Sequence, residues 1–449
     1  MDGHGEGEGV IADSAYRTVA TVRAVGALLA DLHEFVITPE GTALITAYRR
    51  RVADLSAIGG PARAVVLSGV AQEIDIATGR LVLEWDSLDH VPVTDTYLRY
   101  SPGREDLDVG TSGQPFDYFH INSIAVAPDG DLIVSARNTS TVYKLRRRDG
   151  ALRWRLGGRQ SEFAMGPGTR FWWQHDARPD GTGLTLFDDG ASPAREPQSR
   201  GLAISLDTTA MRATLARQYL HPAGLLATAM GSTRRQPDGS VFVGYGTEPS
   251  FSLFSAGGEL LLDGSLPLYD NSYRAFLADW SGQPAEPPAA AARSGQQGST
   301  TVYASWNGAT GVASWTALAG RHPAALAAAG QAARDGFETA VTVSHAGPYF
   351  AAEARDDRGR VLGRSPAVLA GLGRANGHRQ ASPVSVTLSS NGKRRGKAFH
   401  AERGGTVLAG PNRREHHSGR PGRRLPGSGR DAAGVRRYQH ALAGRLPGR

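Results

Sequence analysis

The residue types most suited to chemistry gather around a His-x-Asn pair and a later arginine. The segment FHINSIAVAPDGDLIVSAR holds His120, Asn122 and Arg137, with a Pro-Asp-Gly turn about midway. Side chains two apart in a strand share one face, so His120 and Asn122 should point the same way. A hairpin through that turn should return Arg137 to the end where His120 begins. An arginine fork beside imidazole and amide donors suits a tetrahedral oxyanion such as sulfate or phosphate.

Two more histidines stand ahead of similar turns. His33 lies in DLHEFVITPEG and His175 in WWQHDARPDG. We therefore expect His33, His120 and His175 to open equivalent strands and to face one end of a common channel. A histidine at a strand start is also commonly a hydrogen-bonded structural residue, and three neutral imidazoles can bind a metal. Because Arg137 would repel a dication, we expect no metal and no cofactor.

The neighbours of His175 have less distinctive patterns. Asp176 is placed to orient its imidazole, whereas Asp188 and Asp189 are most simply turn and network residues. The two tryptophans of WWQHDA are expected in a wall or core, with stacking on an aromatic substrate as the alternative.

The segments that carry these residues form an internal repeat. Four of them align without gaps on a Pro-acidic-Gly turn: ITPEGTALITAY, VAPDGDLIVSAR, ARPDGTGLTLFD and RQPDGSVFVGYG. Each turn lies between apolar, β-branched runs, which is typical of a hairpin, and further strand pairs follow the first two. Four antiparallel strands per repeat predict the blades of a β-propeller, although a β-sandwich has similar hairpins.

The composition divides the chain into regions. We expect the propeller to occupy residues 1–280; outer-strand sequence appears at residues 10–30 before any inner strand, so the chain should begin inside the ring and leave it incomplete. Residues 281–299 are rich in Pro, Ala, Gly, Ser and Gln, which predicts a linker. Residues 300–371 return to a strand pattern, which indicates a small fibronectin type III-like β-sandwich with a short helix in AALAAAGQAAR.

The positive charge of the chain is concentrated in residues 372–449. The net charge is +7, yet residues 374–449 hold 17 Lys and Arg against 3 Asp and Glu, which leaves the rest of the chain acidic. We expect an Arg/Gly/Pro-rich disordered tail, either a basic arm or the product of a frameshift in GC-rich DNA, and no nucleic-acid binding by the folded part. The sequence has no cysteine, no run long enough to span a membrane and no signal-peptide pattern.

Taken together, FHINS, VSAR, WWQHDA and FDDG resemble the motifs of the arylsulfotransferase family. GEGEGVIADSAYR, DLHEF and SWNGAT resemble its actinobacterial and fungal branch, and the resemblance covers about residues 6–370. It implies a six-bladed propeller, an extracellular or cell-envelope location, and sulfuryl transfer from an aryl sulfate ester to a phenol without a nucleotide donor. His175 matches the nucleophile that becomes a sulfohistidine. The other active-site residues of the family match His33, His120, Asn122 and Arg137.

The resemblance implies a two-step reaction. His120, Asn122 and Arg137 would hold the sulfate oxygens, His175 would attack sulfur, and His33 would exchange a proton with the phenol. Two other functions stay open, a non-catalytic propeller that binds at the cell envelope and an inactive, truncated product. The His, Asn and Arg set favours the enzyme because a binding module does not need it, whereas the incomplete first blade favours the inactive product.

Overall fold

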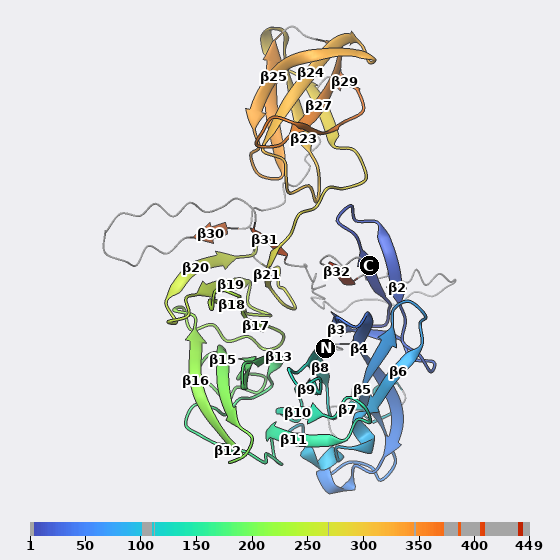
Figure 1. Ribbon diagram of the computed structural model, residues 1–449, viewed down its shortest axis with the longest axis vertical. Coiled ribbons are helices and arrows are strands. Elements are labelled where there is room, and N and C mark those ends of the chain that lie inside the picture. The colour runs from blue at the N-terminus through green and yellow to red at the C-terminus, as the bar shows by residue number, and fades with distance from the viewer. Residues whose placement is uncertain are drawn as a thin grey trace, which may run out of the picture.

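Strands make up almost all of the regular structure (Figure 1). The computed structural model describes residues 4–100, 110–111, 113–267, 269–344 and 347–371, and three short strands beyond them. Within these residues the helices are all single 3-10 turns, so the all-β prediction is confirmed. No helix in the described part of the chain is long and apolar enough to cross a membrane.

Four sheets of four antiparallel strands stand around a common centre and form the predicted propeller blades. Each begins with one of the predicted hairpins, and in two of the turns Gly130 and Gly239 have φ of 82° and 84°, a region that favours glycine. The blades consist of β3 (Ala30–Ile37), β4 (Thr42–Ala53), β5 (Ala64–Asp75) and β6 (Leu81–Asp86); β8 (Ile121–Val126), β9 (Leu132–Ala136), β10 (Thr141–Leu145) and β11 (Leu152–Gly157); β13 (His175–Asp180), β14 (Gly183–Asp188), β15 (Arg200–Asp207) and β16 (Arg212–Leu220); and β17 (Ser232–Arg235), β18 (Val241–Gly244), β19 (Ser250–Phe254) and β20 (Leu260–Ser265). Two short strands, β7 (Phe116–Asp117) and β12 (Ala164–Met165), add in parallel to β5 and β16.

A smaller sheet packs at each end of this series of blades. One holds β1 (Gly9–Ala12), β2 (Thr18–Val22) and β32 (Gln439–Leu442), and the other holds β21 (Phe276–Asp279) and β31 (Gly405–Leu408). The first packs on β4 and β5 through an apolar cluster, and the second packs on β18 and β19 through another. Within the described residues each of these sheets has fewer than four strands, and the expected incomplete ring stays a prediction.

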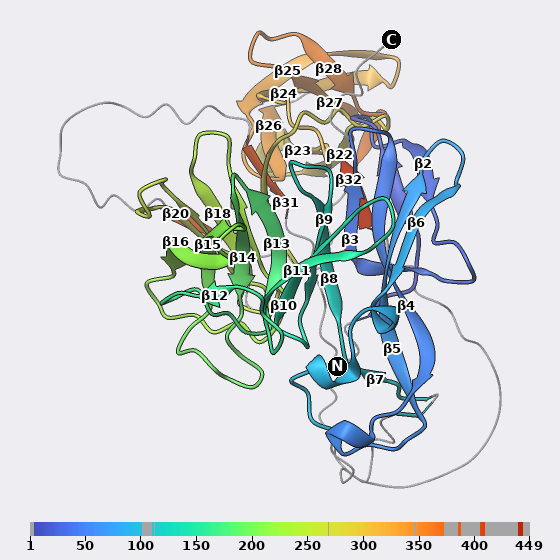
Figure 2. The ribbon, with the colours of Figure 1, turned by 60° about the horizontal axis from the view of Figure 1, so that its bottom comes forward.

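The apolar cores lie between neighbouring blades. Leu44 packs in one cluster with Tyr143 of the next blade, and Leu156 packs in another with Leu186 of the blade after that. Full burial of such a side chain contributes about 1.5–3 kcal/mol. This packing fixes the angle between blades and holds the inner strands β3, β8 and β13 next to one another (Figure 2).

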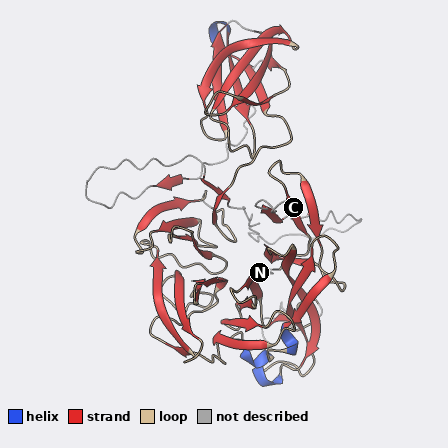
Figure 3. Ribbon diagram, viewed as in Figure 1, coloured by secondary structure: helices blue, strands red, loops and turns tan. Residues whose placement is uncertain are grey.

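A second domain follows the propeller and consists of strands and one 3-10 turn (Figure 3). Its strands are β22 (Ala289–Ser294), β23 (Ser299–Ser305), β24 (Ser314–His322), β25 (Ala325–Ala333), β26 (Glu338–Ser344), β27 (Tyr349–Arg355), β28 (Val361–Arg364) and β29 (Val368–Gly371). Its core joins residues of β23, β24, β26 and β27, including Val302, Trp315, Val341 and Phe350. Membership of the fibronectin type III class stays a prediction.

Two expectations for this region need correction. Residues 281–299 are not all linker, because β22 pairs with β23 and packs Ala290 and Ala292 on the core. The Ala-rich segment expected to be helical is strand β25, because the free edge of β24 offers it backbone partners that outweigh the helix propensity of alanine.

Three short strands lie in the stretch expected to be a disordered tail. β30 (Ser385–Thr387) pairs with β20, β31 with β21, and β32 in parallel with β1. These strands differ from the expectation, since open sheet edges offer unpaired backbone groups to any extended segment. All other residues from 372 onward lie outside the described residues, and for them disorder stays a prediction.

Candidate active site

The inner strands bring the three predicted histidines together. His33 lies in β3, His120 directly precedes β8, and His175 is the first residue of β13. The ring centroids of His33 and His120 are 4.9 Å apart. Tyr273 is adjacent to the cluster, with its ring 5.4 Å from that of His33 and 6.3 Å from that of His175.

Each of these imidazoles has its own aspartate at Nδ1. The three pairs are His33 with Asp31, His120 with Asp117, and His175 with Asp189. In the last pair Nδ1 lies 2.8 Å from Oδ2 of Asp189. A carboxylate that accepts the Nδ1 proton fixes the ring and leaves the lone pair of a neutral imidazole on Nε2.

Burial keeps two of the imidazoles neutral at pH 7. Burial, reinforced by the charge of Arg137, lowers the pKa of His175 well below its ordinary value. Burial also lowers the pKa of His120 to about 4, although Asp117 opposes this shift. Nε2 of His175 has one long contact, from the backbone N–H of Met230 at 3.4 Å. His175 therefore combines an anchored ring with an Nε2 lone pair that accepts only one long hydrogen bond.

The hairpin returns Arg137 to the start of β8, as the spacing predicts. The Arg137 N–H donates to the carbonyl of His120 at 2.9 Å. Its guanidinium lies 5.2 Å from the ring centre of Trp173 and donates to the carbonyl of Thr228 at 3.2 Å. Within the described residues no carboxylate forms an ion pair with it. Burial lowers the pKa of Arg137, but an arginine keeps its charge at pH 7 and can hold an anion near His175.

Asn122 has a different place from the one expected. The alternation of side chains is broken, because His120 has φ of 55° and β8 contains a bulge. The side-chain amide of Asn122 donates to the backbone carbonyl of Gln174 at 2.7 Å. The backbone carbonyl of Asn122 accepts from the Tyr273 hydroxyl at 3.0 Å and from Arg274 at 2.7 Å. Its Oδ1 is buried without a hydrogen-bond partner. Asn122 thus fixes the residue before the nucleophile candidate, and at least one of its amide donors is already used.

The aspartates that hold the histidines were missed or misplaced by the sequence analysis. Asp189, expected to be a turn and network residue, orients His175, whereas Asp176, expected to orient it, contacts a cluster of arginines. The Asp-x-His spacing of Asp31 was a usable signal. Asp117 had no such signal, because its approach to His120 depends on the positive φ at the histidine.

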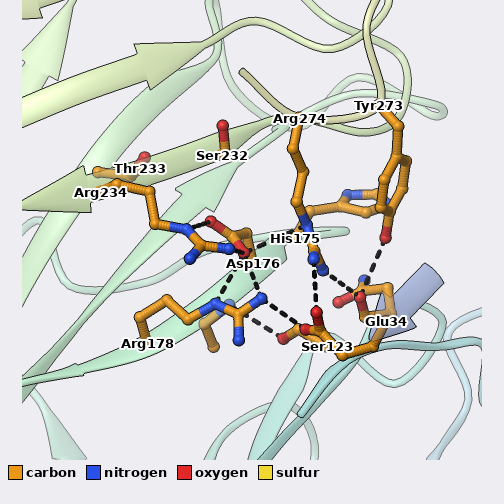
Figure 4. A network of polar contacts seen from close by, with 12 residues as sticks. Glu34, Ser123, His175, Asp176, Arg178, Ser232, Thr233, Arg234, Tyr273 and Arg274 are labelled. Carbon is orange, nitrogen blue, oxygen red and sulfur yellow. Dashed lines mark hydrogen bonds and ion pairs between the residues drawn. The ribbon is translucent and has the colours of Figure 1, made fainter. Parts of the chain in front are cut away.

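Around His175, five charged side chains form a largely buried network (Figure 4). Glu34 of β3 accepts from Arg274 at 2.8 Å, and Asp176 of β13 accepts from Arg234 of β17 at 2.7 Å. Arg178 contacts both carboxylates. Burial alone would raise the pKa of Asp176, but the arginines lower it overall. Three arginines against two carboxylates leave a surplus positive charge close to the candidate site.

One group of donors has the chemistry of a metal site. Ligand atoms of His4, Asp117 and His120 lie within 4.8 Å of one another, and Nε2 of His4 is 3.0 Å from Asp117. His4 was not among the expected residues. The donor types fit a divalent cation. In the structure Asp117 instead bonds to both rings, and the expectation of a metal-free site stays a prediction.

Comparison with known proteins gives one family. The family model described as arylsulfotransferase (ASST) matches residues 1–265, which end in β20, so the match is shorter than the expected 6–370. No curated protein matches the chain. Similar solved structures include a protein of unknown function from Bacteroides caccae, at 12% identity and TM-score 0.33, covering 67% of this chain and 80% of that one. A calcium-binding regucalcin from Agrobacterium tumefaciens has 12% identity and TM-score 0.30, covering 61% of this chain and 81% of that one.

Proposed function

Because this chain belongs to the arylsulfotransferase family, we propose that it moves a sulfuryl group from an aryl sulfate ester to a phenol, with His175 as the nucleophile. The observation that carries this proposal is the pair of His175 and Asp189. The imidazole is buried and neutral, Nδ1 lies 2.8 Å from Oδ2 of Asp189, and the Nε2 lone pair accepts only the long hydrogen bond from Met230. A positioned neutral imidazole of this kind is an activated nucleophile.

In the first half-reaction, Nε2 of His175 attacks sulfur. The N–S bond forms as the bond between sulfur and the aryl oxygen breaks, and the aryl group leaves as a phenolate. Asp189 offsets the positive charge that develops on the ring. Arg137 stabilises the charge on the sulfuryl oxygens, which is greatest in the transition state.

His33 is the proposed proton carrier. Its ring is held by the buried carboxylate of Asp31, and in its protonated form it gives a proton to the departing phenolate. In the second half-reaction the neutral ring takes the proton of the incoming phenol. The phenol oxygen attacks sulfur, the N–S bond breaks, and His175 returns to its neutral form. The reaction is therefore ping-pong.

Three His–Asp pairs at one channel end favour an enzyme over a binding module. A module that only holds a partner gains nothing from imidazoles whose tautomers are fixed one by one. An inactive product would differ from the enzyme in that it forms no sulfuryl adduct.

The test is to trap the intermediate. The protein is incubated with 4-nitrophenyl sulfate and no acceptor, digested at neutral pH, and its peptides are weighed by mass spectrometry. We expect a sulfuryl adduct on the peptide of His175 and none in His175→Ala. His221→Ala is the matched control, since His221 is buried and paired with Asp263 at 3.0 Å after the outer strand β16. An adduct on another residue, or none at all, contradicts the proposal.

A further inference from the structure

A small cavity opens beside the segment that leads into β13. Its volume is about 190 Å³. Pockets for drug-sized ligands measure about 300–1,000 Å³, so this one suits a compound of one or two rings. Its wall includes the side chains of Tyr97, Phe163, Met165, Arg170, Phe171 and Trp172.

The wall is largely aromatic. The rings of Tyr97 and Trp172 meet edge to face with centroids 5.0 Å apart, and both are only half-buried. Phe163 and Phe171 are buried at 4% exposure each. Aromatic edges and faces arranged in this way favour a flat ring over an aliphatic chain.

The rim is cationic. Arg159 lies 4.4 Å from the ring centre of Tyr97, Arg195 lies 5.1 Å from that of Trp172, and Arg170 lines the cavity itself. In the part of the chain that the structure describes, none of the three arginines forms an ion pair with a carboxylate. No acidic side chain lines the cavity. Its charge is therefore complementary to an anion.

The cavity is tied to the candidate active site through one turn. The Trp172 N–H donates to Oδ1 of Asp188 at 2.9 Å, and the next residue, Asp189, holds His175. Trp173, whose face carries Arg137, is also within 6.3 Å of the Tyr97 ring. The aromatic wall and the imidazole are thus fixed by two consecutive carboxylates.

We propose that this cavity is a binding subsite for aromatic anions, the chemical class to which aryl sulfates belong. It holds a flat ring against the half-exposed rings of Tyr97 and Trp172, with the anionic group toward Arg170. That its occupant is a substrate of the transfer reaction rests on the proposed function; the binding itself does not.

The test measures binding without turnover, using naphthalene-1-sulfonate as the probe. By calorimetry we expect one equivalent to bind to the full chain, and about tenfold weaker binding in Trp172→Leu, the effect of one lost aromatic and cation–π partner. Trp280→Leu is the matched control, since Trp280 contacts Tyr16 away from the cavity. Trp172→Leu keeps the backbone bond to Asp188, so unchanged melting separates lost contact from lost fold.

The charge is tested with a second pair of variants. Arg170→Ala should weaken binding of the sulfonate but not of the uncharged naphthalene-1-sulfonamide, whereas Arg148→Ala, which removes an exposed arginine elsewhere, should change neither. The subsite proposal is wrong if naphthalene-1-sulfonate does not bind, or if Trp172→Leu leaves its binding unchanged. It is also wrong if Arg137→Ala, and not Trp172→Leu, abolishes the binding. Binding that depends on Trp172 in a protein that transfers no sulfuryl group would refute the proposed function and leave the subsite standing.

Discussion

Replacing Asp189 with asparagine tests how His175 works. The substitution keeps the size of the side chain but removes the charge that faces Nδ1 at 2.8 Å. The amide can still accept from Nδ1, or it can turn and donate to Nδ1, in which case the ring proton moves to Nε2. The second arrangement blocks the atom that attacks sulfur.

The expected loss follows from these two effects. A hydrogen bond to a charged group contributes about 1.5–3 kcal/mol, and each 1.36 kcal/mol is tenfold in rate, so the lost charge alone lowers the rate by about 10- to 150-fold. Burial raises the pKa of Asp189 well above its ordinary value, which places the loss from the charge at the lower end of that range. Rings held in the wrong tautomer lower it further. We expect kcat/KM to fall by at least about 10-fold.

The assay is the release of 4-nitrophenol from 4-nitrophenyl sulfate, followed from the first turnover. In Asp189→Asn the first burst should slow as much as the steady state, because the damaged step is the formation of the N–S bond. Asp263→Asn removes the charge from the His221 pair in the same way and should change the rate by less than about twofold. If Asp189→Asn keeps a third or more of the wild-type rate, Asp189 does not serve the nucleophile and the assignment of His175 loses its basis.

Three further outcomes are expected. Arg137→Ala should lower kcat/KM for 4-nitrophenyl sulfate by about 100-fold, with partial recovery in Arg137→Lys; equal rates in Ala and wild type would exclude a role in charge stabilisation. His120 has a folded pKa of about 4 against 6.5 in the unfolded chain, so the unfolded state binds more protons and stability falls as pH drops through that window. Urea titrations should show wild type losing about 2 kcal/mol more than His120→Gln between pH 7 and pH 5, and parallel losses would contradict this. Arg274→Ala leaves Glu34 buried without its partner and should cost about 3–5 kcal/mol, against less than about 1 kcal/mol for the exposed Arg17→Ala; a small loss in both would mean that the network is dispensable.

The blades were predictable because their signal is local. Each Pro-acidic-Gly turn forces a hairpin within a dozen residues, and the repeat spacing then places the inner strands. The pairing of β31 with β21 and of β32 with β1 was not predictable, because β31 and β32 come from segments far along the chain that have no periodic pattern. The predictions for alanine-rich β22 and β25 were wrong for a related reason, since their strand pairing depends on the free edge of a neighbouring strand.

The candidate site divides in the same way. The shared position ahead of the turns was enough to predict that His33, His120 and His175 lie close together. Alternation failed at Asn122, because a bulge and a positive φ cannot be read from residue types. Tyr273 enters from a distant segment with no repeat signal.

The network of charged side chains around His175 has a consequence for how the propeller unfolds. Repeat architectures are usually coupled only between neighbours, so units at an end can open alone. Here side chains from β3, β13, β17 and the segment before β21 meet in one cluster. Detaching any of these blades would therefore leave a buried carboxylate or guanidinium without its partner, which is costly. Hydrogen exchange should then find the slowest amides of these sheets opening together, as one cooperative unit.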